Sequence, residues 1–151
     1  NKLKIKNFTM NILGDGPEKN SLINMIKAYN LEKKIKLIGF KNNTTKYYNE
    51  SNLFIHASLF EGFPNAVVEA ISHGVPAICS NSKGGMSEIL LNGRGGDLFP
   101  VNDSDKLSKK IISFYQNPKN LNKKLALARK KIKKYSVSSH VAKYEKVFRD
   151  I

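Results

Sequence analysis

The first two thirds of the chain alternate between short β-rich runs and helical patterns, and this alternation constrains the fold most. Strands are predicted at residues 8–13, 34–40, 52–57 and 75–80, with a short fifth strand ending the segment 92–99. We expect the strand at 8–13 to be buried. Strands separated by helical segments favour a parallel sheet with right-handed crossovers. The predicted fold class is therefore α/β, with a parallel sheet flanked by helices.

After Val101 the pattern becomes entirely helical. One helix is predicted from Asp103 or Ser104 to about residue 116, and a second begins at Pro118. A third starts at Ser136, and its apolar residues recur at helical spacing: Val137, Val141, Tyr144 and Phe148. A length of 151 residues suits one domain with its own core.

Charge limits the partners that the chain can attract. The formal net charge is +14, and the segment from Lys106 to Lys134 holds eleven Lys or Arg and no acid. Such a field attracts phosphates, nucleic acid or an anionic membrane face. The sequence has no apolar run of about 18 residues and no signal-peptide pattern at its start. One cysteine, Cys79, fits a reducing compartment, so we expect a cytoplasmic protein.

The stretch FEGFPNAVVEA places two glutamates, Glu61 and Glu69, around a turn that leads into a helix. Pro64 suits the first helical position, and the backbone amides of residues 65–67 then have no partner inside the helix. Such a helix end binds anions. Asn65, Glu69 and His73 form a polar stripe beside it, where a carboxylate can accept hydrogen bonds from a ribose diol. Two carboxylates beside a diphosphate site describe a nucleotide-sugar pocket.

These residues resemble a known family. E-G-F-P-N-x-x-x-E is similar to the E-x7-E motif of retaining GT-B glycosyltransferases of the family 4, or group 1, type. Further segments follow the family order: ILGDGPEKNSL, LIGF, NLFIHASLFEGFP, AISHGVPAICSNSKGGMSEIL and NGRGGDLFPVND. The resemblance covers roughly Phe8 to Phe148. It implies the Rossmann-like C-terminal half of a GT-B fold, without its first strand–helix unit.

The resemblance also implies roles for single residues. Glu61 corresponds to the catalytic glutamate that stabilises positive charge near the transferred sugar, and Glu69 to the ribose-binding glutamate. Phe40 matches the position whose backbone reads the base, and Gly14 the glycine that lets the ligand approach. The loop that meets the sugar and the diphosphate comprises Gly62, Phe63, Pro64, Asn65 and Ala66. The sequence shows no His, Cys and Asp cluster with metal spacing, so no metal or cofactor is expected.

The implied function is donor binding for sugar transfer from a nucleotide sugar, a UDP-sugar by expectation, to a glycan or lipid-linked acceptor. Bacterial surface polysaccharide, lipopolysaccharide or glycoprotein synthesis is the expected setting. Residues 1–135 are the expected donor-binding domain. Residues 136–151 are the helix that crosses back to an N-terminal acceptor domain, which this chain lacks. We therefore expect little activity from the chain alone, and we expect the apolar stripe of that helix to be exposed or in an intermolecular contact.

Two other functions compete with this interpretation. A pI near 9.9 suits a nucleic-acid-binding module, although the aromatic residues do not interleave with the basic runs. The other alternative is a different nucleotide-sugar enzyme that shares the GT-B fold, such as a non-hydrolysing epimerase. The basic helices also suit a peripheral contact with the inner face of an anionic plasma membrane. For His56, at the end of a predicted strand, we expect a structural or supporting role.

Overall fold

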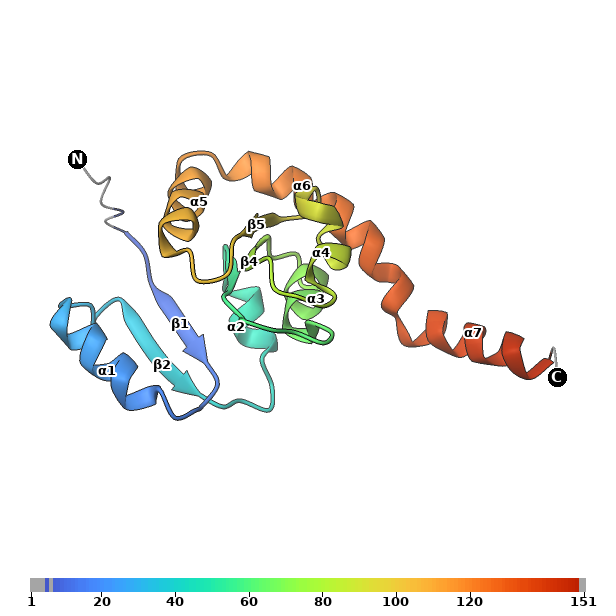
Figure 1. Ribbon diagram of the computed structural model, residues 1–151, viewed down its shortest axis with the longest axis horizontal. Helices are drawn as coiled ribbons and strands as arrows, with labels where there is room; N and C mark the ends of the chain where they lie inside the picture. The colour runs from blue at the N-terminus through green and yellow to red at the C-terminus, as the bar shows by residue number, and fades with distance from the viewer. Residues whose placement is uncertain (1–4, 6, 150–151) are drawn as a thin grey trace. The chain divides into compact units, whose positions relative to one another are not determined.

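A computed structural model describes residues 5 and 7–149 and shows the predicted α/β fold with parallel sheets flanked by helices (Figure 1). The chain forms two compact units, residues 1–47 and 48–151, and each unit has its own sheet. The predicted division into a donor-binding domain, residues 1–135, and a crossing helix, residues 136–151, is a functional one and stays a prediction. Residues 1–4 and 6 of the first and 150–151 of the second lie outside the described residues.

The first unit is a single strand–helix–strand element. Strand β1 (Met10–Leu13) pairs in parallel with β2 (Ile35–Gly39), and α1 (Lys19–Ala28) connects them. We expected residues 8–13 to form a buried strand, but Phe8 and Met10 are exposed. The expected burial was wrong because this sheet is small. It has only two strands, both of them edge strands, and a single ten-residue helix covers it. A short helix, α2 (Thr45–Asn49), follows β2.

The second unit contains a three-stranded parallel sheet in the order β3-β4-β5. Its strands are β3 (Phe54–His56), β4 (Ala77–Ser80) and β5 (Asp97–Phe99). Between them lie α3 (Asn65–Ser72), α4 (Met86–Ile89) and the 3-10 turn η1 (Leu91–Gly93). Every residue of the central strand β4 is buried. Cys79 is the small buried residue that its β-rich surroundings predicted, and burial raises the pKa of its thiol.

Two basic helices, α5 (Ser104–Gln116) and α6 (Pro118–Ile132), complete the second unit. The predicted starts of both helices are confirmed. The Asp103 carboxylate accepts a hydrogen bond from the Lys106 amide at 2.8 Å, and Pro118 opens α6. Helix α6 packs Ala128 into the same buried core as α3 and α4. Asp97 of β5 joins the helices to the sheet through Lys124, at 2.6 Å.

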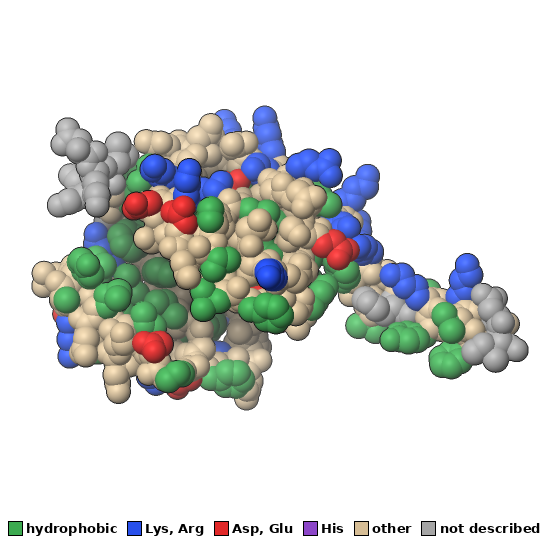
Figure 2. All heavy atoms as spheres, viewed as in Figure 1, with side chains coloured by type: hydrophobic (Ala, Val, Ile, Leu, Met, Phe, Trp, Pro, Cys, Tyr) green, Lys and Arg blue, Asp and Glu red, His purple; other side chains and the backbone are tan. Residues whose placement is uncertain are grey.

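The last helix, α7 (Val137–Arg149), follows the 3-10 turn η2 (Lys133–Tyr135). Its predicted apolar stripe is exposed, as we expected: Val137, Val141, Tyr144 and Phe148. Figure 2 shows hydrophobic side chains along one side of α7 and basic side chains on the other. Among the described residues, no helix combines the length and the apolar character needed to cross a membrane.

Candidate functional site

The Glu61 side chain lies in the loop that joins β3 to α3, at the carboxyl end of the sheet. Its carboxylate is 23% exposed, and Oε1 lies 2.7 Å from Nε2 of His56, the last residue of β3. The strand therefore fixes the imidazole, and the imidazole holds one oxygen of the carboxylate. Parallel α/β sheets bind ligands at this edge. The contact agrees with the structural or supporting role expected of His56, and that role stays a prediction.

The segment after β4 holds the Glu61 loop in place. The Glu61 amide donates to the Lys83 carbonyl at 3.2 Å, and the Gly85 amide donates to the Gly62 carbonyl at 3.1 Å. Gly84, with φ of +113°, lies between them. A Cβ at Gly84 would lie 1.7 Å from the Glu61 carbonyl oxygen, so only glycine fits there. The Gly-Gly pair therefore fixes the path of the loop.

Helix α3 begins one residue later than predicted. Pro64 is the N-cap, and the first helical residue is Asn65. The Asn65 amide donates to the Phe63 carbonyl at 2.9 Å, and the Val67 amide donates to the Pro64 carbonyl at 3.0 Å. The tight turn at Pro64 thus satisfies two of the three amides that we expected to be unpaired. Of these three amides, only that of Ala66 has no backbone acceptor in the described residues, so the predicted anion site is smaller.

Glu69 lies on the exposed stripe of α3, as the helical spacing predicted for Asn65, Glu69 and His73. The Tyr48 hydroxyl lies 3.2 Å from Glu69 Oε2 and 3.2 Å from the Ala66 carbonyl oxygen. Tyr48 is only 8% exposed, and the His73 ring stacks on it at 5.3 Å. Sequence analysis missed Tyr48, because a tyrosine in a short polar helix gives no signal of a contact 21 residues away.

A second anchor connects the loop to the end of the basic helices. The Phe63 ring meets Tyr135 edge-on at 5.1 Å, and the Tyr135 hydroxyl donates to Glu88 Oε1 at 2.8 Å. Lys134 Nζ donates to the same oxygen at 2.6 Å. The Lys134 hydrogen bond and then the Tyr135 hydroxyl lower the pKa of Glu88 to about 2. Sequence analysis also missed this contact, because Glu88 and Tyr135 are 47 positions apart.

The remaining predicted residues belong to the first unit. The Gly14 amide donates to the Gly39 carbonyl at 3.0 Å, which brings Gly14 beside the residue that precedes Phe40. Gly14 has φ of +115°, and Phe40 is exposed just after β2. Both lie at the carboxyl ends of the β1–β2 pair. Glu61, Glu69 and the loop between them belong to the second unit.

A family model identifies the chain. The model described as "Glycosyl transferases group 1" matches residues 1–135. The chain belongs to this family. The E-x7-E glutamates, the loop between them and the Gly-Gly segment all lie within the matched residues.

Two bacterial relatives of this group 1 chain carry specific names. The Campylobacter jejuni relative is N-acetylgalactosamine-N,N'-diacetylbacillosaminyl-diphospho-undecaprenol 4-alpha-N-acetylgalactosaminyltransferase, and it is 33% identical over 72% of this chain. The Escherichia coli relative is UDP-Gal:alpha-D-GlcNAc-diphosphoundecaprenol alpha-1,3-galactosyltransferase, and it is 35% identical over 67% of this chain. The aligned parts are 30% and 26% of the lengths of these relatives, so the chain spans less than a third of either.

Among solved structures, a mutant of S. aureus TarM in complex with fondaparinux, alpha-GlcNAc-glycerol and UDP is similar in fold. The TM-score is 0.81 at 26% identity, over 93% of this chain and 29% of the TarM chain. The structural neighbours are GT-B glycosyltransferases, and this chain corresponds to a part of that fold consistent with its C-terminal half. In the described residues, no cluster of His, Cys, Asp and Glu is arranged to hold a metal ion.

Proposed function

We propose that the chain is the nucleotide-sugar-binding domain of a retaining glycosyltransferase of the family 4 type, with a UDP-sugar as donor. The observation that carries the proposal is the fixed carboxylate of Glu61. It is held by His56 at the carboxyl edge of a parallel sheet, one turn before a helix that presents Glu69. Ligands of open α/β folds bind at this edge.

The two glutamates and the start of α3 would contact different parts of the nucleotide sugar. Glu61, partly shielded from water, is suited to stabilise the positive charge that develops on the transferred sugar. Glu69, oriented by Tyr48, is suited to accept hydrogen bonds from the ribose hydroxyls. The Ala66 amide and the positive end of α3 would face the diphosphate as it leaves. The base-binding roles of Gly14 and Phe40 stay predictions.

The names of similar proteins support retention and a UDP donor. The E. coli relative is named for a UDP-Gal donor and an alpha-1,3 product. UDP-galactose is itself an α-linked donor, so an α product keeps the anomeric configuration. The TarM complex likewise pairs UDP with an alpha-GlcNAc ligand.

The acceptor side of the proposal rests on the same relatives. Both bacterial relatives are named for diphospho-undecaprenol acceptors. We therefore propose a glycan or lipid-linked acceptor, bound by a part of the protein beyond this chain, in bacterial surface polysaccharide or related glycan synthesis. A cytoplasmic location, with peripheral contact to the inner membrane face, accords with that acceptor. The chain alone would transfer little or no sugar.

The test uses the full-length protein with a panel of UDP-sugars, and NMR of the product gives its anomeric configuration. We expect transfer with retention from one UDP-sugar. Glu61→Gln should lower kcat by about 100-fold or more, as expected for loss of transition-state charge stabilisation. The control Glu145→Gln, on exposed α7, should leave kcat unchanged. An inverted product, or full activity of Glu61→Gln, would contradict the proposal.

The basic helices favour one competing function, a nucleic-acid-binding module. Eleven Lys or Arg between residues 106 and 134 supply a phosphate-attracting field. Titration of the chain with UDP and with mixed-sequence oligonucleotides separates the two functions. We expect UDP to bind in a manner that Glu69→Ala weakens, and oligonucleotides to bind only weakly and to dissociate at 0.2 M salt, roughly the range in which counterion effects dominate.

A further inference from the structure

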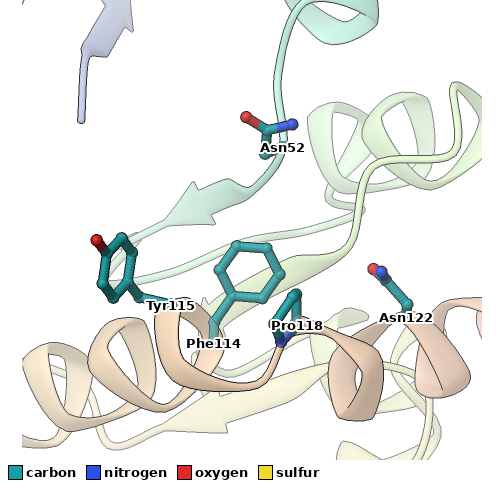
Figure 3. A pocket seen from close by; sticks show the side chains of 5 residues that line it. All are labelled: Asn52, Phe114, Tyr115, Pro118 and Asn122. Carbon is teal, nitrogen blue, oxygen red and sulfur yellow. The ribbon is translucent and has the colours of Figure 1, made fainter. Parts of the chain in front are cut away.

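A hollow of about 360 Å³ lies near the start of strand β3 in the second unit (Figure 3). Asn52, on the segment that leads into β3, forms one side of it. The end of α5 and the start of α6 form the other side. The five lining residues are Asn52, Phe114, Tyr115, Pro118 and Asn122. Asn52 precedes β3 and Glu61 follows it, so the hollow and the Glu61 loop lie at opposite ends of this strand.

The hollow combines a rigid aromatic floor with an adaptable polar rim. Phe114 is partly buried and packs against the core residues of β4, β5 and α6, which fixes its ring. Tyr115, beside it, is 51% exposed and offers a free aromatic surface. Figure 3 shows Asn52 across the hollow from Phe114, and Asn122 beyond Pro118. Each carboxamide supplies two N–H donors and one carbonyl acceptor.

The absence of charge in the lining is the discriminating feature. The chain has a net charge of +14, yet none of the five residues that line this hollow is charged. A phosphate or nucleic-acid site would use Lys or Arg side chains to bind the phosphate, and the neighbouring helices α5 and α6 contain many of them. The uncharged aromatic and carboxamide lining therefore favours a neutral ligand that has an apolar face and hydroxyl groups around its edge.

We propose that this hollow is a saccharide subsite that binds one ring of a neutral glycan, a hexose or an N-acetylhexosamine. The C–H face of a pyranose ring packs on the aromatic side chains, and its hydroxyls bond to the two carboxamides. The subsite would hold acceptor or product glycan away from the transfer centre. Only that assignment to acceptor or product rests on the proposed transferase function, because glycan binding itself needs no donor.

The test is NMR titration of the isotope-labelled chain with maltotetraose and with chitotetraose, and separately with UDP. We expect one of the saccharides to shift the side-chain amide signals of Asn52 and Asn122 and the backbone signals around Tyr115. UDP should leave these signals in place. If the chain binds a saccharide but not UDP, the result contradicts the proposed donor site and leaves the saccharide subsite standing. The experiment therefore distinguishes failure of one proposal from failure of the other.

Matched variants complete the experiment. Tyr115→Ala should weaken saccharide binding about five- to tenfold, as expected for loss of one ring-stacking contact. Tyr144→Ala is the control, because Tyr144 is also an exposed helical tyrosine, 65% exposed on α7, and does not line the hollow. Saccharide shifts that lie only outside the hollow, or that survive unchanged in Tyr115→Ala, would overturn the proposal. So would saturable binding of inorganic phosphate at these signals, or no shift with either saccharide.

Discussion

At the scale of single residues, the contact between Glu61 and His56 decides how the loop carboxylate is presented. The 2.7 Å contact spans only five positions, so the strand end and the loop orient each other. His56 touches the carboxylate through Nε2, so we infer that it acts as a positioning residue.

The first prediction concerns His56→Ala in the full-length protein. Without the imidazole, the Glu61 carboxylate loses its fixed orientation, and kcat should fall roughly tenfold while KM for the donor changes little. The conservative variant His56→Gln keeps a donor within reach and should recover part of kcat. Steady-state kinetics check both variants. A rise in KM with unchanged kcat would show that His56 does not position the carboxylate.

The second prediction concerns Gly84→Ala. The added methyl group meets the Glu61 carbonyl oxygen at 1.7 Å, so the loop or the Gly-Gly segment must move. We expect the free energy of unfolding to fall by about 3–5 kcal/mol, measured by urea denaturation. Gly93→Ala is the matched control, since Gly93 also has positive φ but meets no atom within 4 Å. It should cost only about 1–2 kcal/mol. Equal effects of the two variants would contradict the steric argument.

At the scale of elements, the Glu88 carboxylate links α4 to the end of the basic helices. Lys134 and Tyr135 both donate to its Oε1, and Tyr135 carries the contact on to the loop through Phe63. The carboxylate thus joins two segments that are distant in sequence, and the Tyr135 ring adds the Phe63 loop as a third.

The third prediction is a pH dependence from Glu88. Its pKa falls from the ordinary value of 4.5 to about 2 in the folded protein. A lowered carboxyl pKa means that the unfolded state binds more protons, so this stabilisation is present above about pH 4.5 and disappears as the pH falls to about 2. Urea denaturation at several pH values should show a smaller acid loss for Glu88→Gln than for the native chain. Identical pH profiles would contradict the contact.

The fourth prediction concerns α7. Because its apolar stripe is exposed, removal of residues 137–151 should change the free energy of unfolding of the remainder by no more than about 1 kcal/mol. It should also reduce the binding of a hydrophobic dye and self-association, since the stripe is an exposed apolar surface. A large loss of stability on truncation would show that α7 packs on the core.

The local pattern predicted the elements well but their contacts poorly. Pro118 and Asp103 mark helix starts through chemistry within one turn, so both were predicted correctly. The start of α3 was wrong by one residue, because the tight turn at Pro64 uses amides that an ideal helix would leave unpaired. The Tyr48 contact with Glu69 and the Tyr135 contact with Glu88 depend on how elements pack. No local spacing encodes such contacts, so sequence analysis missed them.

At the scale of the whole molecule, net charge and the proposed lipid-linked acceptor point to the same environment. Basic residues near an anionic membrane contribute about 1 kcal/mol each and act within a Debye length. The fifth prediction is that the chain binds vesicles with 30% anionic lipid, a composition of roughly physiological charge, at low salt and is released at about 0.5 M salt. Cosedimentation measures the bound fraction. Binding that persists unchanged at high salt, or that is equal on neutral vesicles, would contradict the electrostatic account.

The most direct test of the central claim is an NMR titration of the isotope-labelled chain with UDP-glucose and UDP-N-acetylglucosamine. The account predicts shifts at the backbone amides of residues 60–63, 65–66 and 84–85, and it predicts that Glu69→Ala weakens them. Tyr144→Ala should leave them unchanged. No shift at these amides with either UDP-sugar, or shifts confined to the basic helices, would contradict the claim that this loop and helix end form a nucleotide-sugar site.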